Sequence, residues 1–190
     1  MATKQNEVRV GVQPPPGNVV APNGFPADPG PRDAPQIFLD AKDIRVAVFC
    51  EEQNCSLERE VDEDDPRSWS WVAYLRTPSH ESTEKPVSTL RIVPPPHDPH
   101  PNGFYDPSEE PYIKITRVAT LSTARGLGLS RQLLNHAFDY LASQPQLIAR
   151  GWKGLVLTHA QVDVEGMYLK LGFVTDDKLG RWDEEGIEHL

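Results

Sequence analysis

The stretch that decides the fold of this chain is RVATLSTARGLGLSRQLL, residues 117–134. Its first residues belong to an alternating, β-branched run that begins at Tyr112 and ends at Thr120, which predicts a strand. A short glycine-rich turn follows. From Leu129 to about Ser143 apolar residues then repeat at helical spacing. The stretch therefore predicts a strand, a glycine-rich turn and a helix in direct succession.

The turn has the features of a phosphate site. Glycines at 126 and 128 allow a ligand to approach the backbone closely. The helix start leaves N–H groups without intrahelical partners and carries partial positive charge. Arg125 can add a charge to a phosphate. The spacing is neither a Walker A loop nor a Rossmann fingerprint, because Arg131 stands where the third Rossmann glycine belongs. The alternative is a glycine-rich turn that only starts a helix.

On the C-terminal side, residues 154–160 (GLVLTHA) predict a buried strand. A second apolar stripe at helical spacing predicts a short helix closed by Gly172; the stripe consists of Val164, Met167, Tyr168 and Leu171. Residues 173–174 then predict the start of another strand. This succession of strands and helices implies an α/β sheet.

On the N-terminal side, a strand is expected at 8–12, a helix at 37–49, and a hairpin of strands 70–75 and 87–93 that turns at 77–80. Residues 58–65 are acidic and predict a solvated loop. Eighteen of the 19 prolines lie at or before Pro111. They mark two proline-rich loops at 14–35 and 94–111, which a central strand or a long helix would not tolerate. We expect a single domain over residues 1–190.

Composition excludes several function classes. The net charge of −9 argues against a general nucleic-acid binder; it fits attraction of cationic small molecules, or plain solubility. Two cysteines, Cys50 and Cys55, are too few for a disulfide framework and lack the ligand pairs of a zinc site, so no metal and a reduced, cytoplasmic compartment are expected. No secretory signal is visible at residues 1–7, and no apolar run is long enough to span a membrane.

The glycine turn, residues 125–130 (RGLGLS), resembles the Arg/Gln-x-x-Gly-x-Gly/Ala loop of the GNAT N-acetyltransferase superfamily, with Ser130 in place of the small residue. Residues 117–120 resemble the strand before that loop. Residues 157–161 and 167–173 resemble the second half of the family, where Tyr-x-x-x-Gly-Phe recurs. Residues 44–53, 62–66 and 185–189 are similar to its ElaA-like branch, although Glu188 replaces the usual proline. The resemblance covers about residues 37 to 190 and implies a mixed central sheet with helices on both faces.

What the resemblance implies is transfer of an acetyl group from acetyl-CoA to an amine, by direct attack in a ternary complex. Val118 and Thr120, with Ala119 between them, would offer backbone groups to the pantetheine arm. The pyrophosphate would lie on the N–H groups of the turn, contributed by Arg125, Gly126, Leu127, Gly128, Leu129 and Ser130. A backbone N–H near Val118 would stabilise the oxyanion. Tyr168 matches the general acid for the leaving thiolate, although its place on the apolar stripe also suits a core residue.

The resemblance does not identify the residue that acts as general base. Many relatives have a Glu on the motif strand, where this sequence has Thr116. The candidate bases elsewhere are Glu52, Glu185, His159 and His189. Glu52 is equally a solvated charge at a helix end, and His159 equally a core histidine.

The acceptor is expected to be a small-molecule amine, such as an amino sugar or a polyamine. The alternatives are a non-enzymatic CoA-binding module and acetylation of a protein or peptide. A homodimer that pairs through the strand around Ile187 is also expected.

Overall fold

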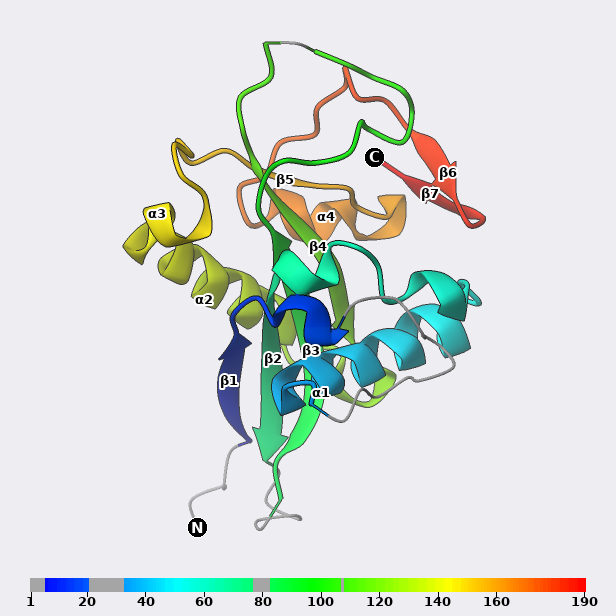
Figure 1. The fold of residues 1–190 in the computed structure, drawn as a ribbon. Helices are drawn as coiled ribbons and strands as arrows, with labels where there is room; N and C mark the ends of the chain where they lie inside the picture. The colour runs from blue at the N-terminus through cyan, green and yellow to red at the C-terminus, as the bar shows by residue number, and fades with distance from the viewer. Residues whose placement is uncertain (1–5, 21–32, 77–82, 107) are drawn as a thin grey trace.

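The computed structural model describes residues 6–20, 33–76, 83–106 and 108–190. Its centre is a five-stranded sheet with the order β1-β2-β3-β4-β5 (Figure 1). Its strands are β1 (Glu7–Gln13), β2 (Trp69–Arg76), β3 (Lys85–Val93), β4 (Ile113–Thr120) and β5 (Val156–Thr158). The first four pair antiparallel and β5 pairs parallel to β4, so the sheet is mixed. A separate hairpin is formed by β6 (Trp182–Glu184) and β7 (Ile187–His189).

The described residues contain four α-helices beside the sheet: α1 (Gln36–Arg45), α2 (Leu129–Ser143), α3 (Pro145–Ile148) and α4 (Glu165–Leu169). α1 continues as a π-helix, η2 (Val46–Glu52). Short 3-10 turns are η1 (Gly17–Val20), η3 (Leu57–Arg59), η4 (Asp65–Arg67), η6 (Ser122–Ala124) and η7 (Val162–Val164). No helix among the described residues is long and apolar enough to cross a bilayer.

Helices α1 and α2 cover opposite faces of the sheet (Figure 1). Strand β2 explains why, because it is apolar on both sides and successive side chains point to opposite faces. Trp71 and Ala73 pack in the cluster that contains the apolar face of α2. Val72 and Tyr74 pack with Ala41 and other residues of α1. The expected mixed sheet with helices on both faces is therefore confirmed.

Three expectations about local structure are wrong. Residues 173–174 form no strand: Val174 is exposed, while Phe173 packs its ring edge-on against Tyr168. The strand expected at 154–160 is limited to β5 because its neighbour diverges from it. The acidic segment 58–65 is not a solvated loop, since Glu60 and Asp65 are buried. The turn at 77–80, most of the first proline-rich loop and the chain start at 1–5 lie outside the described residues.

The second proline-rich loop has no helix or strand in its described part, but it is anchored by rings. His97 and His100 both stack on Tyr112, at ring distances of 4.4 and 6.1 Å. His100 Nδ1 also lies 3.3 Å from His159 Nε2, and His159 meets the ring of Trp182 on β6. These five residues, called here the histidine cluster, join the loop to β5 and to the C-terminal hairpin. Figure 1 shows the loop and this hairpin at the same end of the molecule.

The hairpin strand β7 has two pairing edges in use. One edge pairs with β6, and at the other His189 forms a bridge with Gln161. Leu190 exchanges two backbone hydrogen bonds with Ala160 beside it. A dimer that pairs through the strand around Ile187 would have to displace one of these pairings.

Candidate functional site

Strands β4 and β5 separate at the point where the candidate site begins. They pair over only three residues each, Ile113–Ile115 with Val156–Thr158. Beyond these pairs, residues 116–120 and 159–161 have no partner in each other's strand, so backbone polar groups of β4 on the side of β5 are left for a ligand, whereas Ala160 bonds to Leu190 instead. A pocket of about 670 Å³ lies there and is lined by both segments.

A β-bulge marks the β4 side of the pocket. Thr89 faces Ala119 and Arg91 faces Thr116, so two residues of β4, Arg117 and Val118, stand opposite Leu90 alone. Arg117 has a φ of +53°, a left-handed conformation that is unfavourable for a residue with a Cβ. A bulge withdraws backbone groups from the ladder and re-aims them. The backbone of Arg117 and Val118 is thus available to the pocket, which both residues line.

The glycine turn lies at one end of the same pocket, called here the phosphate end, where Arg125 and Ser130 line the pocket. Gly126 and Gly128 have φ values of +80° and +72°, and a Cβ at either would meet nothing within 4 Å. No side chain caps the start of α2. Its first N–H groups are therefore free for an anion. These residues fit a pyrophosphate: a positive helix terminus, an uncapped turn and open space before it.

Glu52 lies at this phosphate end. Its carboxylate accepts from the Arg125 guanidinium at 2.6 and 2.7 Å. That hydrogen bond lowers the pKa of Glu52, so the group is ionised and already engaged at neutral pH. The structure thus places this candidate base beside Arg125.

Tyr168 is positioned by the end of α4. Phe173 N–H donates to the Tyr168 carbonyl, and Gly172 N–H donates to the Leu169 carbonyl. Gly172 has a φ of +92°, and this combination is the Schellman motif that glycine permits at a helix end. The Tyr168 side chain is buried and lines the pocket, where the side chain of Thr158 hydrogen-bonds its hydroxyl. Burial raises the pKa of Tyr168, so the phenol keeps its proton at neutral pH.

The other three candidate bases are Glu185, His159 and His189, and all of them line the pocket. They lie at the end away from Arg125, called here the far end. Glu185 accepts from Ser56 N–H at 2.9 Å and lies 3.4 Å from the Arg59 guanidinium. Burial, together with Lys114 and the other histidines, lowers the pKa of His159 to about 3. His159 is therefore neutral and a weak proton acceptor at neutral pH. His189 hydrogen-bonds the Ile187 carbonyl through Nδ1.

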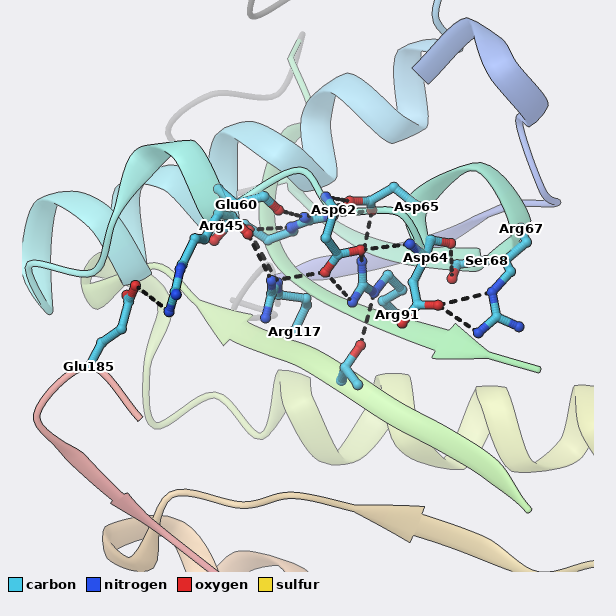
Figure 2. A network of polar contacts seen from close by, with 12 residues as sticks. Arg45, Glu60, Asp62, Asp64, Asp65, Arg67, Ser68, Arg91, Arg117 and Glu185 are labelled. Carbon is cyan, nitrogen blue, oxygen red and sulfur yellow. Dashed lines mark hydrogen bonds and ion pairs between the residues drawn. The ribbon is translucent and has the colours of Figure 1, made fainter. Parts of the chain in front are cut away.

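A network of paired charges, most of them buried, lies along this far end (Figure 2). Four of its members line the pocket: Glu60, Asp62, Arg91 and Arg117. The network consists of Arg45, Arg91 and Arg117 with Glu60, Asp62 and Asp65, and is called here the arginine network. Sequence reasoning missed it. The available signal was that each of these arginines follows or precedes apolar residues within an otherwise buried helix or strand. Such a position is costly for a charge unless it is paired.

The network contains three arginines and three carboxylates, so its formal charges balance. Burial alone would lower the pKa of Arg45, but Asp65 and Glu60 outweigh it and raise that pKa. Burial opposes ionisation of Asp65, but Arg45 and Arg91 hold the pKa of Asp65 well below its usual range. The network therefore builds a rigid, self-neutralised wall rather than an acidic surface.

Among the described residues, no group of three or more His, Cys, Asp and Glu side chains is arranged to hold a metal ion.

Several solved structures share the fold. An acyl-CoA N-acyltransferase of Pseudomonas aeruginosa is 22% identical, with 96% of each chain covered and a TM-score of 0.59. ElaA of Escherichia coli is 17% identical, with 97% of each chain covered and a TM-score of 0.57. A predicted acetyltransferase of Clostridium acetobutylicum, solved with acetyl-CoA, is 15% identical over 95% of each chain, with a TM-score of 0.51.

At these identities the structural likeness concerns the fold. The sequence profile of the acetyltransferase (GNAT) family, however, matches residues 41–173, a span that includes the bulge, the glycine turn and Tyr168. The chain therefore belongs to the acetyltransferase (GNAT) family, whose members transfer an acetyl group from acetyl-CoA.

Proposed function

We propose that this chain acetylates the primary amine of a small molecule by direct attack on acetyl-CoA in a ternary complex. The observation that carries the proposal is the continuity of the pocket. One cavity of about 670 Å³ runs from Arg125 past Tyr168 to the arginine network. A phosphate site and a proton donor thus share one space with the charged far end, which would hold the acceptor amine and is called here the acceptor end. The net charge of −9 is compatible with attraction of an amine, which is mostly a cation at neutral pH.

Acetyl-CoA, when bound, supplies the thioester that the amine attacks. The N–H groups of residues 125–130 and the Arg125 side chain would bind its pyrophosphate. Val118, Ala119 and Thr120 would bind the pantetheine arm along the free edge of β4, where β5 has diverged. A backbone N–H of the bulge at Val118 would stabilise negative charge on the carbonyl oxygen.

Tyr168 would donate the proton that the leaving thiolate needs. Two observations support this role: its phenol lines the pocket and its raised pKa keeps the proton in place. A general acid must hold its proton until the transition state requires it.

Among the four candidate bases, Glu185 is best placed to take the proton of the amine, directly or through a water molecule. Ser56 N–H fixes its carboxylate at the acceptor end of the pocket. Glu52 is held by Arg125 at 2.6 Å, whereas Glu185 lies 3.4 Å from the exposed guanidinium of Arg59. The low pKa of His159 makes it a poor proton acceptor. His189 lies at the same end as Glu185 and is the alternative.

The test is a panel of amines incubated with acetyl-CoA, with thiol release and product mass measured for the wild type and Tyr168→Phe. We expect Tyr168→Phe to lower kcat by about a hundredfold or more, because the acid is lost, while the Kd for CoA changes by less than about twofold. Tyr105→Phe is the control, since Tyr105 is exposed on the second proline-rich loop. CoA binding without turnover of any amine would indicate a binding module instead, and unchanged turnover in Tyr168→Phe would remove the acid role.

A further inference from the structure

Lys114 places a positive charge in the acceptor end of the pocket. It lies on β4 between Ile113 and Ile115, which face the α2 side of the sheet and are fully buried. The alternation of a strand therefore turns Lys114 to the opposite face, where it lines the pocket and is half-buried. No described residue lies within hydrogen-bonding or ion-pairing distance of its ammonium group.

Apart from Glu184, which is exposed, the charges around Lys114 are already paired with one another. The arginine network is balanced, Asp64 pairs with Arg67 at 2.6 Å, and Glu185 pairs with Arg59. Burial lowers the pKa of Lys114, and Arg91 and Arg117 add to this effect, while Asp64 and Glu184 oppose it without outweighing it. Lys114 is thus a partly desolvated cation that a negative group would stabilise.

Thr116 offers a second donor on the same strand face, two residues along β4. Its hydroxyl oxygen accepts from Arg91 Nε at 2.9 Å. A hydroxyl that accepts in this way still has its hydrogen to donate, and no acceptor for that hydrogen lies among the described residues. Thr116 lines the same pocket. Because Arg91 is itself buried and held by Asp62, the Thr116 hydroxyl has a fixed orientation.

We propose that the acceptor amine carries a carboxylate, and that Lys114 and Thr116 bind this carboxylate. The inference rests on the proposed acetylation of a small-molecule amine and narrows it. A single ammonium left over beside a balanced network matches one negative charge, which a carboxylate brings. A phosphate ester brings up to two. The acceptor class is then an amino acid or another short amino carboxylate, in place of an amino sugar or polyamine.

The experiment uses the full chain with CoA bound and measures binding by calorimetry. The probes are glycine, β-alanine, γ-aminobutyrate and δ-aminovalerate, each compared with its own carboxamide, and phosphoethanolamine. We expect at least one amino carboxylate to bind about tenfold more tightly than its carboxamide, the gain typical of a hydrogen bond to a charged group. Lys114→Met should remove this preference, Lys114→Arg should keep most of it, and both should leave the Kd for CoA unchanged. Lys153→Met is the matched control, because Lys153 is exposed and pairs with Glu110.

Equal affinity for each carboxylate and its carboxamide would overturn the inference, as would a preference that survives in Lys114→Met. Tighter binding of phosphoethanolamine than of every carboxylate would overturn the choice of a carboxylate. Acetylation of the same probes, followed by product mass, separates this inference from the proposed function. A carboxylate preference without acetylation supports the binding site and contradicts the activity, whereas acetylation without the preference does the reverse.

Discussion

The Arg45 guanidinium is 1% exposed and has Glu60 and Asp65 as its ionic partners. These partners are 15 and 20 residues further along the chain, and they are equally buried. Water cannot replace Arg45 beside them. The position of the segment that lines the acceptor end of the pocket thus depends on one side chain of α1.

We expect Arg45→Met to lower the free energy of unfolding by about 3–5 kcal/mol, because it leaves two carboxylates buried without their cation. Urea denaturation at pH 7 measures this. Arg150→Met, at an exposed position, serves as the control and should change stability by less than about 0.5 kcal/mol. A loss below about 1 kcal/mol in Arg45→Met would contradict the importance given to the network.

At the scale of single residues, the sequence indicated the residues with a local signature. Gly172 at a helix end and Gly128 before a helix follow from rules that span a few residues, and both have a positive φ. The arginine network has no such local signature, since Arg45 meets Glu60, and Arg117 meets Asp62, only once the sheet has formed. Segment 58–65 was therefore expected to be solvated, although its carboxylates are paired from three other elements.

The elements that bring the glycine turn to the pocket are β4 and α2, and the turn between them is the most directly testable part of the site. The Thr120 and Ser130 hydroxyls lie 3.0 Å apart across it. This contact ties the strand end to the first turn of the helix. The N–H groups before Ser130 are thereby held at the mouth of the pocket.

Gly128→Glu should weaken CoA binding by at least about tenfold, because it adds a negative charge where the helix terminus would hold a pyrophosphate. The substitution also introduces a Cβ at a φ of +72°. Gly151→Glu is the matched control, since Gly151 has a φ of +81° and equally open surroundings but follows α3, beyond the opposite end of α2. Calorimetric titration with CoA compares the two variants, and equal affinities would argue against the phosphate site.

Periodicity predicted the elements that have one clear period. Strand β4 and helix α2 appear with nearly the expected bounds, because alternation and helical spacing reflect burial on the two faces of this sheet. Periodicity failed where the structure of a segment depends on its pairing with a neighbouring strand. Residues 173–174 have strand-forming side chains but no strand beside them. The bulge at Arg117 depends on the register with β3, which a single strand does not encode.

The whole molecule should lose stability on mild acidification because of the histidine cluster. His159 has a pKa of about 3 in the folded chain, against about 6.5 for an ordinary histidine. Between these values the unfolded chain binds a proton at this position that the folded chain does not bind. Stability therefore rises with pH through this window and is lost as the pH falls from about 6.5 towards 3.

Urea denaturation between pH 7 and pH 4.5 measures this effect, at pH values above those at which Asp62 and Asp65 become protonated, because the pKa of each is lowered. The denaturation midpoint should fall across the range in the wild type and fall less in His159→Gln. Burial lowers the pKa of His97 as well, so part of the dependence should remain. A pH dependence identical in His159→Gln and wild type would show that His159 does not carry it.

For the molecule as a whole, the mixed sheet and its two covered faces could be expected from the sequence and its family resemblance. The path of the second proline-rich loop could not. Its prolines exclude regular structure, but they do not indicate that His100 will meet His159, which lies 59 residues further along the chain. Contacts of that range depend on the assembled sheet and on the hairpin beside it.

The histidine cluster also constrains which substitutions this protein can tolerate during evolution. This cluster of contacting rings contains side chains from the second proline-rich loop, from the end of β5 and from β6. In a packed contact of this kind, the cost of a change in one side chain depends on the others. A substitution at His100 is then tolerated or rejected according to what stands at positions 159 and 182. The loop and the hairpin should therefore diverge together as one inherited unit, while the prolines between the anchored rings are free to change on their own.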